Sequence, residues 1–223
     1  WHAETVAAAL ARLDARREGL GEAEAEQRLH RFGPNTLSQA RGPNSLQRWL
    51  AQFHNLFIYA LIVAAVGAWL LDHFIDAAVI FAVVLINAAI GYVQEGRAER
   101  ALAAVRGMLT PSASVMRDGH RQTLAAARLV PGDIVFLEPG DRVPADLRVV
   151  HARGLRVDES ALTGESLAVE KSVEPVVADA PLGDRGSMLH SGTLIEAGQG
   201  QGLVVATGGD TELGRISALL SNV

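Results

Sequence analysis

The sequence predicts an α+β membrane protein with short N-terminal helices, a two-helix transmembrane hairpin, a cytoplasmic stalk helix and a small, mostly β domain. Three observations support this fold class. Apolar residues recur at helical spacing near the start, two long runs without charge follow, and β-branched segments alternate with turn signals afterwards. The predicted boundaries are 1–48 for the N-terminal helical segment and linker, 49–93 for the hairpin, 94–111 for the stalk and 112–223 for the β domain.

Composition excludes several classes of protein. The chain has 223 residues and a net charge of −5, so it offers no overall basic character for binding nucleic acid. It contains no cysteine, which rules out disulfides and thiolate metal sites. It starts at Trp1 without an initiator methionine or a signal-peptide pattern, and we expect it to be a piece of a longer protein.

The N-terminal segment predicts two short amphipathic helices. Its apolar residues follow three- and four-residue steps: Val6, Leu10 and Leu13, then Ala25, Leu29 and Phe32. Gly19 and Gly21 separate the two helices. The second helix should end at "FGPN", because Pro34 cannot continue the hydrogen-bond ladder. A polar linker then runs to Arg48.

Two uncharged runs, Leu56–Leu71 and Ala77–Val93, predict membrane helices. With their apolar flanks they approach the roughly 20 residues that a bilayer requires. The alternative is a pair of buried helices in a soluble core. We favour the membrane because two adjacent uncharged runs of this length exceed the usual pattern of a buried helix.

Charge around these runs predicts their orientation. Arginines lie on the outer side of both runs: Arg41, Arg48, Arg97, Arg100 and Arg106. The connecting "DHFID" holds Asp72 and Asp76 but no Lys or Arg, so the positive-inside rule places both ends in the cytoplasm. Amphipathic rings fall near the ends of the runs, where the membrane interface favours them: Trp49, Trp69 and Tyr92.

Two polar features of the hairpin have competing interpretations. Asp72, His73 and Asp76 lie within one helical turn, a spacing that suits a metal, but charged residues are also expected at the end of a membrane helix. We favour the helix end and assign no metal site. Asn87 lies inside the second run, where an interhelical hydrogen bond is a better interpretation than an ion ligand.

After Tyr92 the second membrane helix is predicted to continue as a stalk, because "QEGRAERALAAVRGML" keeps an apolar stripe beside a charged face.

Short strands separated by turns follow: "ASVMRDG", "DIVFLEPGD", "DLRVV", "LRVDES", "SGTLIEAG" and "GLVVATGG". "GQGQG", Gly198 to Gly202, lacks the context of a nucleotide loop and predicts a hairpin turn. The closing "TELGRISALLSNV" predicts a helix.

Between two predicted strands, "VDESALTGES" gathers several side-chain oxygens around one glycine. The loop carries Thr163, Gly164, Glu165 and Ser166. Gly164 permits a tight or left-handed turn, which the hydroxyls of Thr163 and Ser166 can fix locally. A carboxylate such as Glu165 is ionised at neutral pH and can take a proton from water. Taken alone, the loop is better interpreted as a polar connection between strands.

Six blocks of sequence together resemble the cation-transporting P-type ATPases, most closely the type II branch of calcium-pump-like enzymes. They occur in the family's order and span nearly the whole chain: "GLGEAEAEQRLHRFGPNTL", "QFHNLFIYAL", "NAAIGYVQEGRAERAL", "RLVPGDIVFLEPGDRVPADLRVV", "VDESALTGES" and "TGGDTELGRIS". The resemblance implies that the β domain is the actuator domain, a distorted jelly roll that carries the TGES loop.

The resemblance also implies the chemistry. Such pumps transfer phosphate from ATP, with Mg²⁺, to an aspartate elsewhere in the protein and then hydrolyse the acyl phosphate. Glu165 matches the residue that orients and deprotonates the attacking water, with Thr163, Gly164 and Ser166 shaping its loop. The sequence departs from the family pattern at Ala168, where a proline is common after the loop.

No DKTGT phosphorylation motif and no nucleotide-binding domain occur in the sequence, so this chain should be inactive alone. The favoured hypothesis is the N-terminal part of a multi-pass cation pump in a bacterial cell membrane. Its implied partners are the lipid bilayer, the transported cation and the phosphorylation and nucleotide-binding domains. The cation cannot be named because its ligands lie in later membrane helices. The alternative is a truncated, non-catalytic, membrane-anchored β module with a regulatory or partner-binding role.

Overall fold

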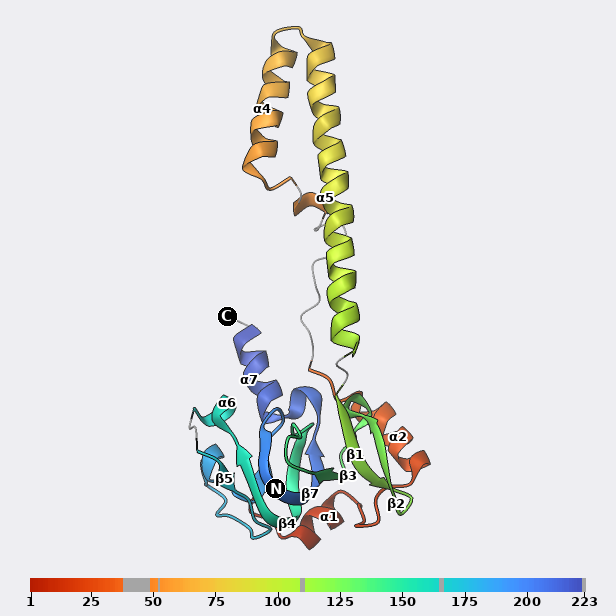
Figure 1. Cartoon of the computed structure of the whole chain (residues 1–223), viewed down its shortest axis with the longest axis vertical. Helices are drawn as coiled ribbons and strands as arrows, with labels where there is room; N and C mark the ends of the chain where they lie inside the picture. Colours follow the sequence, from red (N-terminus) through yellow and green to blue (C-terminus); the bar gives the residue numbers. More distant parts are fainter. Residues whose placement is uncertain (38–48, 52, 109–110, 165–166, 222–223) are drawn as a thin grey trace. The chain divides into compact units, whose positions relative to one another are not determined.

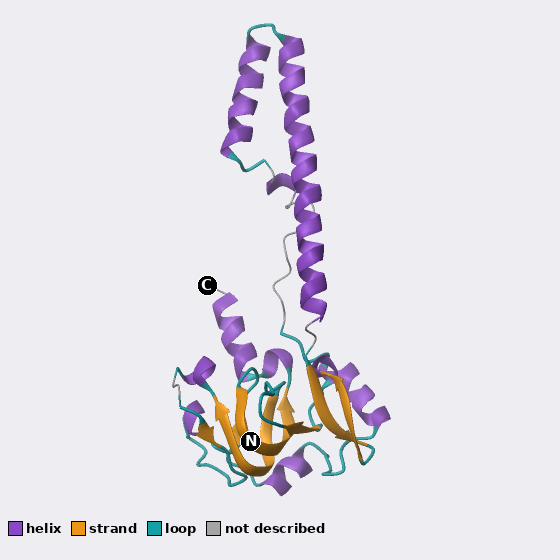
Figure 2. Cartoon of the chain, viewed as in Figure 1, coloured by secondary structure: helices purple, strands orange, loops and turns teal. Residues whose placement is uncertain are grey.

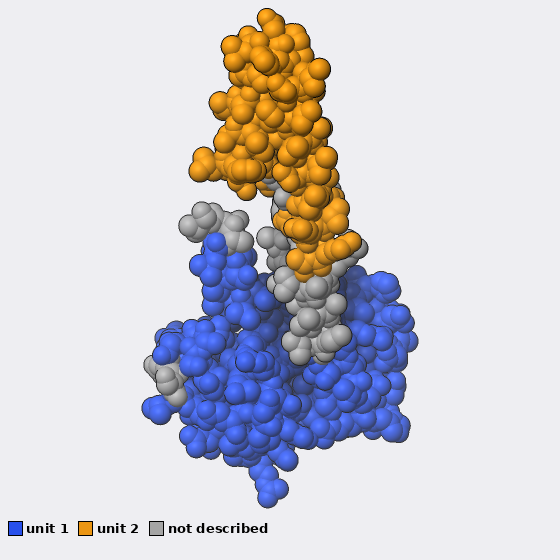
Figure 3. Space-filling model, turned by 45° about the horizontal axis from the view of Figure 1, so that its top comes forward, with its two compact units in different colours: residues 1–38, 110–223 blue, residues 39–109 orange. Residues whose placement is uncertain are grey.

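The computed structural model describes residues 1–37, 49–51, 53–108, 111–164 and 167–221. They form two compact units, one made of Trp1–Ser38 and Thr110–Val223 and the other of Gln39–Leu109 (Figure 3). In the sequence, the two stretches that form the first unit therefore come before and after the second unit.

In the unit of residues 39–109, helix α4 (Leu56–Leu70) packs against helix α5 (Phe74–Met108). Asn55 begins α4, because its side-chain oxygen accepts a hydrogen bond from the Phe57 amide at 2.9 Å. α5 continues without interruption past the charged residues that follow Tyr92. Within the described part of the chain, one helical segment, Phe74–Ala98, is long and apolar enough to cross a membrane, while α4 is apolar but has only 15 residues.

The other unit is built around one antiparallel sheet in the order β2-β1-β3-β7-β4-β5, with β6 also paired to β4 (Figures 1 and 2). Its strands are β1 (Ser112–Arg117), β2 (His120–Ala125), β3 (Ile134–Leu137), β4 (Asp146–Asp158), β5 (Val169–Glu170), β6 (Met188–Leu189) and β7 (Leu194–Ala206). Its helices are α1 (Val6–Arg12), α2 (Glu22–Phe32), α6 (Ser160–Thr163) and α7 (Glu212–Ser221), with short 3₁₀ turns at Ala126–Arg128, Leu182–Asp184 and Gly208–Asp210.

The two longest strands correct the sequence-based prediction. "DLRVV" and "LRVDES" belong to the single strand β4, and "GQGQG" lies inside β7 instead of forming a hairpin turn. The reason is a glycine pair across the two strands. Gly154 and Gly198 both have positive φ, and a Cβ on Gly198 would lie 2.1 Å from the Gly154 carbonyl oxygen. The glycines that suggested turns instead allow irregularities in the β4–β7 register, through which both strands continue.

Apolar side chains cover both faces of the sheet. The larger cluster includes Val115, Leu147, Val157 and Ile195, all buried. On the other side, α1 contributes Ala9 to a second cluster that includes Ile134, Val150, Met188, Leu203 and Val205. The predicted N-terminal helices are thus present, and the apolar stripe of α1 packs on this second cluster. In α2, Ala25 and Leu29 pack in a third, small cluster, whereas Phe32, the last residue of the predicted stripe, is exposed.

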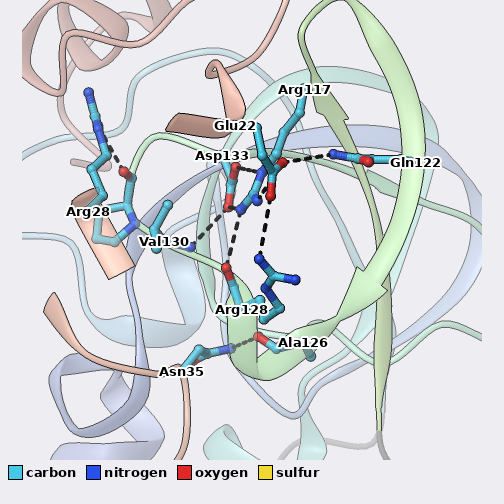
Figure 4. Close-up of polar contacts among 10 residues, drawn as sticks. Glu22, Arg28, Asn35, Arg117, Gln122, Ala126, Arg128, Val130 and Asp133 are labelled. Atoms are coloured by element: carbon cyan, nitrogen blue, oxygen red, sulfur yellow. Dashed lines mark hydrogen bonds and ion pairs between the residues drawn. The ribbon is translucent and has the colours of Figure 1, made fainter. Parts of the chain in front are cut away.

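A buried ion pair next to α2 holds β1, and one of its members also contacts the first residue of α2 (Figure 4). Arg117 on β1 donates from Nε and Nη2 to the two carboxylate oxygens of Asp133, at 3.0 and 2.8 Å. Its Nη1 also lies 3.4 Å from Glu22 Oε2, at the start of α2. The Glu22 amide donates to Asp118 Oδ2 at 3.1 Å, so the first turn of α2 is held from the β1–β2 turn.

Asn35, in the "FGPN" segment, fixes the chain after α2. The helix ends at Gly33 as predicted, and the Gly33 amide donates to the Leu29 carbonyl at 2.9 Å. Asn35 Nδ2 then donates to the carbonyls of Ala126 and Pro144 at 3.0 and 2.8 Å, and its Oδ1 accepts from the Gly208 amide at 2.8 Å. One side chain therefore connects three segments of the β unit.

Arg148, on β4, is fully buried, and the partners of its guanidinium among the described residues are backbone carbonyls. Five donor contacts of 2.8–3.2 Å reach the carbonyl oxygens of Glu4, Val149, Val173 and Ser187. No described carboxylate lies within ion-pair distance, and burial lowers the pKa of Arg148. This side chain connects the N-terminal residues to the segment that follows β5.

Candidate functional site

The candidate site is the loop that leaves the end of β4. Asp158, the last residue of the strand, accepts a hydrogen bond at Oδ1 from the Ser160 amide at 2.9 Å and so begins the short helix α6. The hydrogen bonds from Ser160 hold the pKa of Asp158 below its ordinary value. This half-buried carboxylate therefore remains ionised and helps to start the turn.

Thr163 and Gly164 lie at the end of α6. The carbonyl of Glu159 accepts hydrogen bonds from the Thr163 amide at 3.0 Å and from the Thr163 hydroxyl at 3.1 Å. Gly164 has φ 78° and ψ −1°, the left-handed conformation that glycine favours, and its amide donates to the Ser160 carbonyl at 2.9 Å. The predicted tight turn at Thr163-Gly164 is therefore present. Glu165 and Ser166, the other two predicted site residues, lie outside the described residues.

The chain returns from the loop along β5, which pairs with the end of β4. Val169 lies opposite Val157, Glu170 lies opposite Arg156, and the Lys171 amide donates to the Leu155 carbonyl at 2.8 Å. The two ends of the loop are thus joined by a short antiparallel ladder.

A buried ion pair lies at this base. Glu159 Oε1 lies 2.8 Å from Lys171 Nζ, and the side chains are 1% and 0% exposed. Burial raises the pKa of Glu159 and lowers the pKa of Lys171, while their mutual attraction opposes both shifts. Sequence reasoning missed this pair. Glu159 occurs in the segment "VDESALTGES" that was singled out, Lys171 lies five residues beyond that segment, and nothing in their spacing indicated that both are buried.

A second group of buried polar residues lies near Lys171. His190 is buried, and the positive charges of Lys171, Arg185 and His2 add to desolvation in lowering the pKa of His190 to about 4. The imidazole is therefore neutral at physiological pH. The Asp146 carboxylate accepts hydrogen bonds from the Ser191 amide at 2.8 Å and from the Glu212 amide at 2.7 Å. The second of these bonds caps the start of α7.

Two family models of known proteins match this chain. Residues 1–67 match the family model described as the N-terminus of cation transporters and ATPases. Residues 107–221, which include the whole sheet and the loop, match the model of the P-type ATPase actuator domain. The chain belongs to the P-type ATPase family.

Similar proteins carry names of the same kind. The chain is 52% identical over 202 residues to the probable cation-transporting ATPase F of Mycobacterium tuberculosis, 44% identical over 199 residues to the cation-transporting ATPase pma1 of a Synechocystis species, and 39% identical over 207 residues to a calcium-transporting ATPase of Bacillus subtilis. The matches cover 91%, 89% and 92% of this chain but only 22%, 22% and 23% of the relatives. The chain thus spans less than a quarter of their length.

Proposed function

We propose that this chain is the N-terminal and actuator part of an ATP-driven cation pump, and that its TGES loop serves hydrolysis of an aspartyl phosphate held elsewhere in the pump. The observation that carries the proposal is the match of residues 107–221 to the actuator domain of P-type ATPases, with the TGES sequence at the end of β4. The relatives' names support cation transport in general terms.

In this proposal Glu165 orients the attacking water and takes its proton, because an ionised carboxylate is a suitable base at neutral pH. Gly164 lets the backbone approach the phosphate closely. Thr163 and Ser166 shape the loop around them. The hydrogen bonds from Thr163 to the Glu159 carbonyl support the role given to Thr163, since they hold the loop before Gly164.

ATP and Mg²⁺ are implied by the family for the complete pump. The described residues of this chain include no group of three or more His, Asp or Glu side chains that fits a metal ion. From the resemblance to the family, we propose that both bind to parts of the pump other than this chain. The further partners of the proposal are the transported cation and the phosphorylation and nucleotide-binding domains.

We also propose the finer organisation expected from the sequence: residues 1–48 as the N-terminal segment and linker, 49–93 as a transmembrane hairpin, 94–111 as a stalk and 112–223 as the actuator domain, with a distorted jelly-roll arrangement. The long, irregular strands β4 and β7 support the jelly roll, because register irregularities let strands bend around a core. The continuation of α5 to Met108 supports the stalk.

The membrane hairpin is supported by the surface of α4 and α5. Large apolar side chains on both helices are exposed within their unit, among them Leu56, Val63, Ile75 and Ile86. Such a surface is unfavourable in water and suits a bilayer. α4 is short for a span, and bilayer thinning or flanking residues can compensate for this. We propose a multi-pass protein of a bacterial cell membrane with both ends of the hairpin in the cytoplasm.

A labelling experiment tests this topology. The chain has no cysteine, so single cysteines introduced at His73 and at Ser112 will report their positions without background. A membrane-impermeant thiol reagent should label His73→Cys and Ser112→Cys from opposite sides of the membrane, because arginines flank the hairpin and its connecting turn is acidic. Labelling of both sites from the same side would exclude the hairpin.

The pump itself is tested with the full-length protein in membrane vesicles. On addition of labelled ATP and Mg²⁺, we expect a phosphoprotein that is stable in acid and cleaved by hydroxylamine, as an acyl phosphate is, together with ATP-dependent cation uptake. The segment of residues 1–223 alone should not become labelled and serves as the control. A phosphoprotein that resists hydroxylamine, or no phosphoprotein at all, would contradict the proposal.

A further inference from the structure

The buried pair of Glu159 and Lys171 connects the two ends of the TGES loop. Glu159 precedes α6, and Lys171 directly follows β5. Their charged groups are 2.8 Å apart, and no further hydrogen-bond partner reaches either group within the described structure. Each charge is therefore balanced only by the other.

The backbone of Glu159 bears directly on the loop. Its carbonyl accepts the amides of Leu162 and Thr163 and the Thr163 hydroxyl, at 2.9, 3.0 and 3.1 Å. The position of Glu159 thus sets the position of α6 and of the Thr163-Gly164 turn. On the other side, the Lys171 amide donates to the Leu155 carbonyl, which fixes Lys171 against β4.

A buried ion pair is a poor source of net stability, because desolvation of two charges offsets most of their attraction. It is nevertheless demanding in geometry, since any displacement of one group leaves both charges buried and unbalanced. The same unit contains a second buried ion pair, in which Arg117 Nη2 lies 2.8 Å from Asp133 Oδ2. That pair joins β1 to the segment before β3, and none of its hydrogen bonds among the described residues reaches the TGES loop. The position of the Glu159–Lys171 pair, at the base of the loop, distinguishes it.

We propose that Glu159 and Lys171 are positioning residues for dephosphorylation, holding the two ends of the TGES loop at the separation at which Glu165 can act on the water. The proposal rests on the proposed function of the loop. Neither residue touches the phosphate in this proposal, and both act through the loop that carries Glu165. A misplacement of about 1 Å at a reacting group can slow a reaction about 100-fold. The Glu159–Lys171 ion pair, called the bridge below, therefore needs only to prevent small displacements of the loop.

The test measures formation and decay of the phosphoenzyme in the full-length pump. Glu159→Ala and Lys171→Met each remove one half of the bridge, and we expect decay after an ATP chase to slow about 10- to 100-fold while formation stays within about twofold of the parent. Glu159→Gln keeps an oxygen that can accept a hydrogen bond from Lys171 Nζ but removes the charge that balances Lys171, so its decay rate should lie between those of the parent and Glu159→Ala.

Asp133→Asn is the matched control, because it perturbs the other buried ion pair. It should lower the temperature of unfolding but leave the decay rate of phosphorylated molecules unchanged. If Asp133→Asn slows decay as much as Glu159→Ala, the bridge has only a structural role and the proposal is wrong. Parental decay in Glu159→Ala and Lys171→Met, or loss of phosphorylation in both, would also overturn it, because the bridge is assigned to a step after phosphorylation.

Glu165→Gln separates this inference from the function on which it rests. If Glu165→Gln decays at the parental rate, the proposed role of the loop fails. If Glu165→Gln slows decay but Glu159→Ala and Lys171→Met do not, only the positioning role fails.

Discussion

Replacing Glu165 by Gln in the full-length pump should make the phosphoenzyme accumulate. Gln keeps the size of Glu and some of its hydrogen bonding but cannot accept a proton, so the water that attacks the acyl phosphate loses its base. Removal of a general base typically slows a reaction about 10²- to 10⁴-fold, which corresponds to roughly 3 to 5 kcal/mol. In the proposed mechanism, phosphorylation from ATP takes place on a distant aspartate, so it should proceed at a near-normal rate.

The measurement is an ATP chase of labelled phosphoenzyme, compared with the rate of its formation. Glu170→Gln is a suitable control, because Glu170 is an exposed carboxylate on β5 that lies opposite Arg156 and outside the TGES sequence. Its phosphoenzyme should decay at the parental rate. A Glu165→Gln pump that folds but never becomes phosphorylated, or one whose phosphoenzyme decays normally, would remove Glu165 from the proposed role.

The largest expected loss of stability follows from replacing Arg148 by Met. Met fills a similar volume but makes none of the five hydrogen-bond contacts, and the carbonyls of Glu4, Val173 and Ser187 would lose this buried donor. The Ser187 carbonyl keeps its hydrogen bond from the Val149 amide at 2.9 Å, so the carbonyls of Glu4 and Val173 are the two that lose their donor. Each unsatisfied carbonyl costs about 1 to 3 kcal/mol, so we expect a total loss of about 2 to 5 kcal/mol.

Thermal unfolding in detergent, followed by circular dichroism, measures this loss. Arg142→Met is the matched control, since Arg142 is exposed and donates one hydrogen bond, to the Gly192 carbonyl at 3.1 Å. That variant should change the free energy of unfolding by less than about 0.5 kcal/mol. Equal effects of the two substitutions would show that the buried contacts of Arg148 contribute little.

The sequence predicted the parts of the fold that depend on local pattern. The end of α2 at Gly33, the apolar stripes of α1 and α2 and the left-handed turn at Gly164 all follow from residue type and spacing. The continuity of β4 and β7 did not follow. Gly154 and Gly198 are ambiguous in isolation, and only their pairing across the sheet distinguishes an irregularity within a strand from a turn.

The same distinction applies to the candidate site. Thr163 and Gly164 could be selected because a glycine within a run of hydroxyl and carboxyl residues is a local signal. Lys171 could not, because its pairing with Glu159 depends on β5 returning along β4 and on the burial of both side chains. Likewise, the depressed pKa of His190 results from burial and from Lys171, Arg185 and His2, of which His2 lies at the other end of the chain.

The packing of the N-terminal helices on the sheet has a consequence for synthesis of the protein. α1 is made first, but its buried partners in the core include Leu203 and Val205, near the end of β7. A ribosome adds about 5 to 20 residues per second, so roughly 10 to 40 seconds pass before those partners exist. During that interval the uncharged runs of α4 and α5 are also made. Membrane insertion of these helices should therefore precede completion of the domain to which the first residues belong.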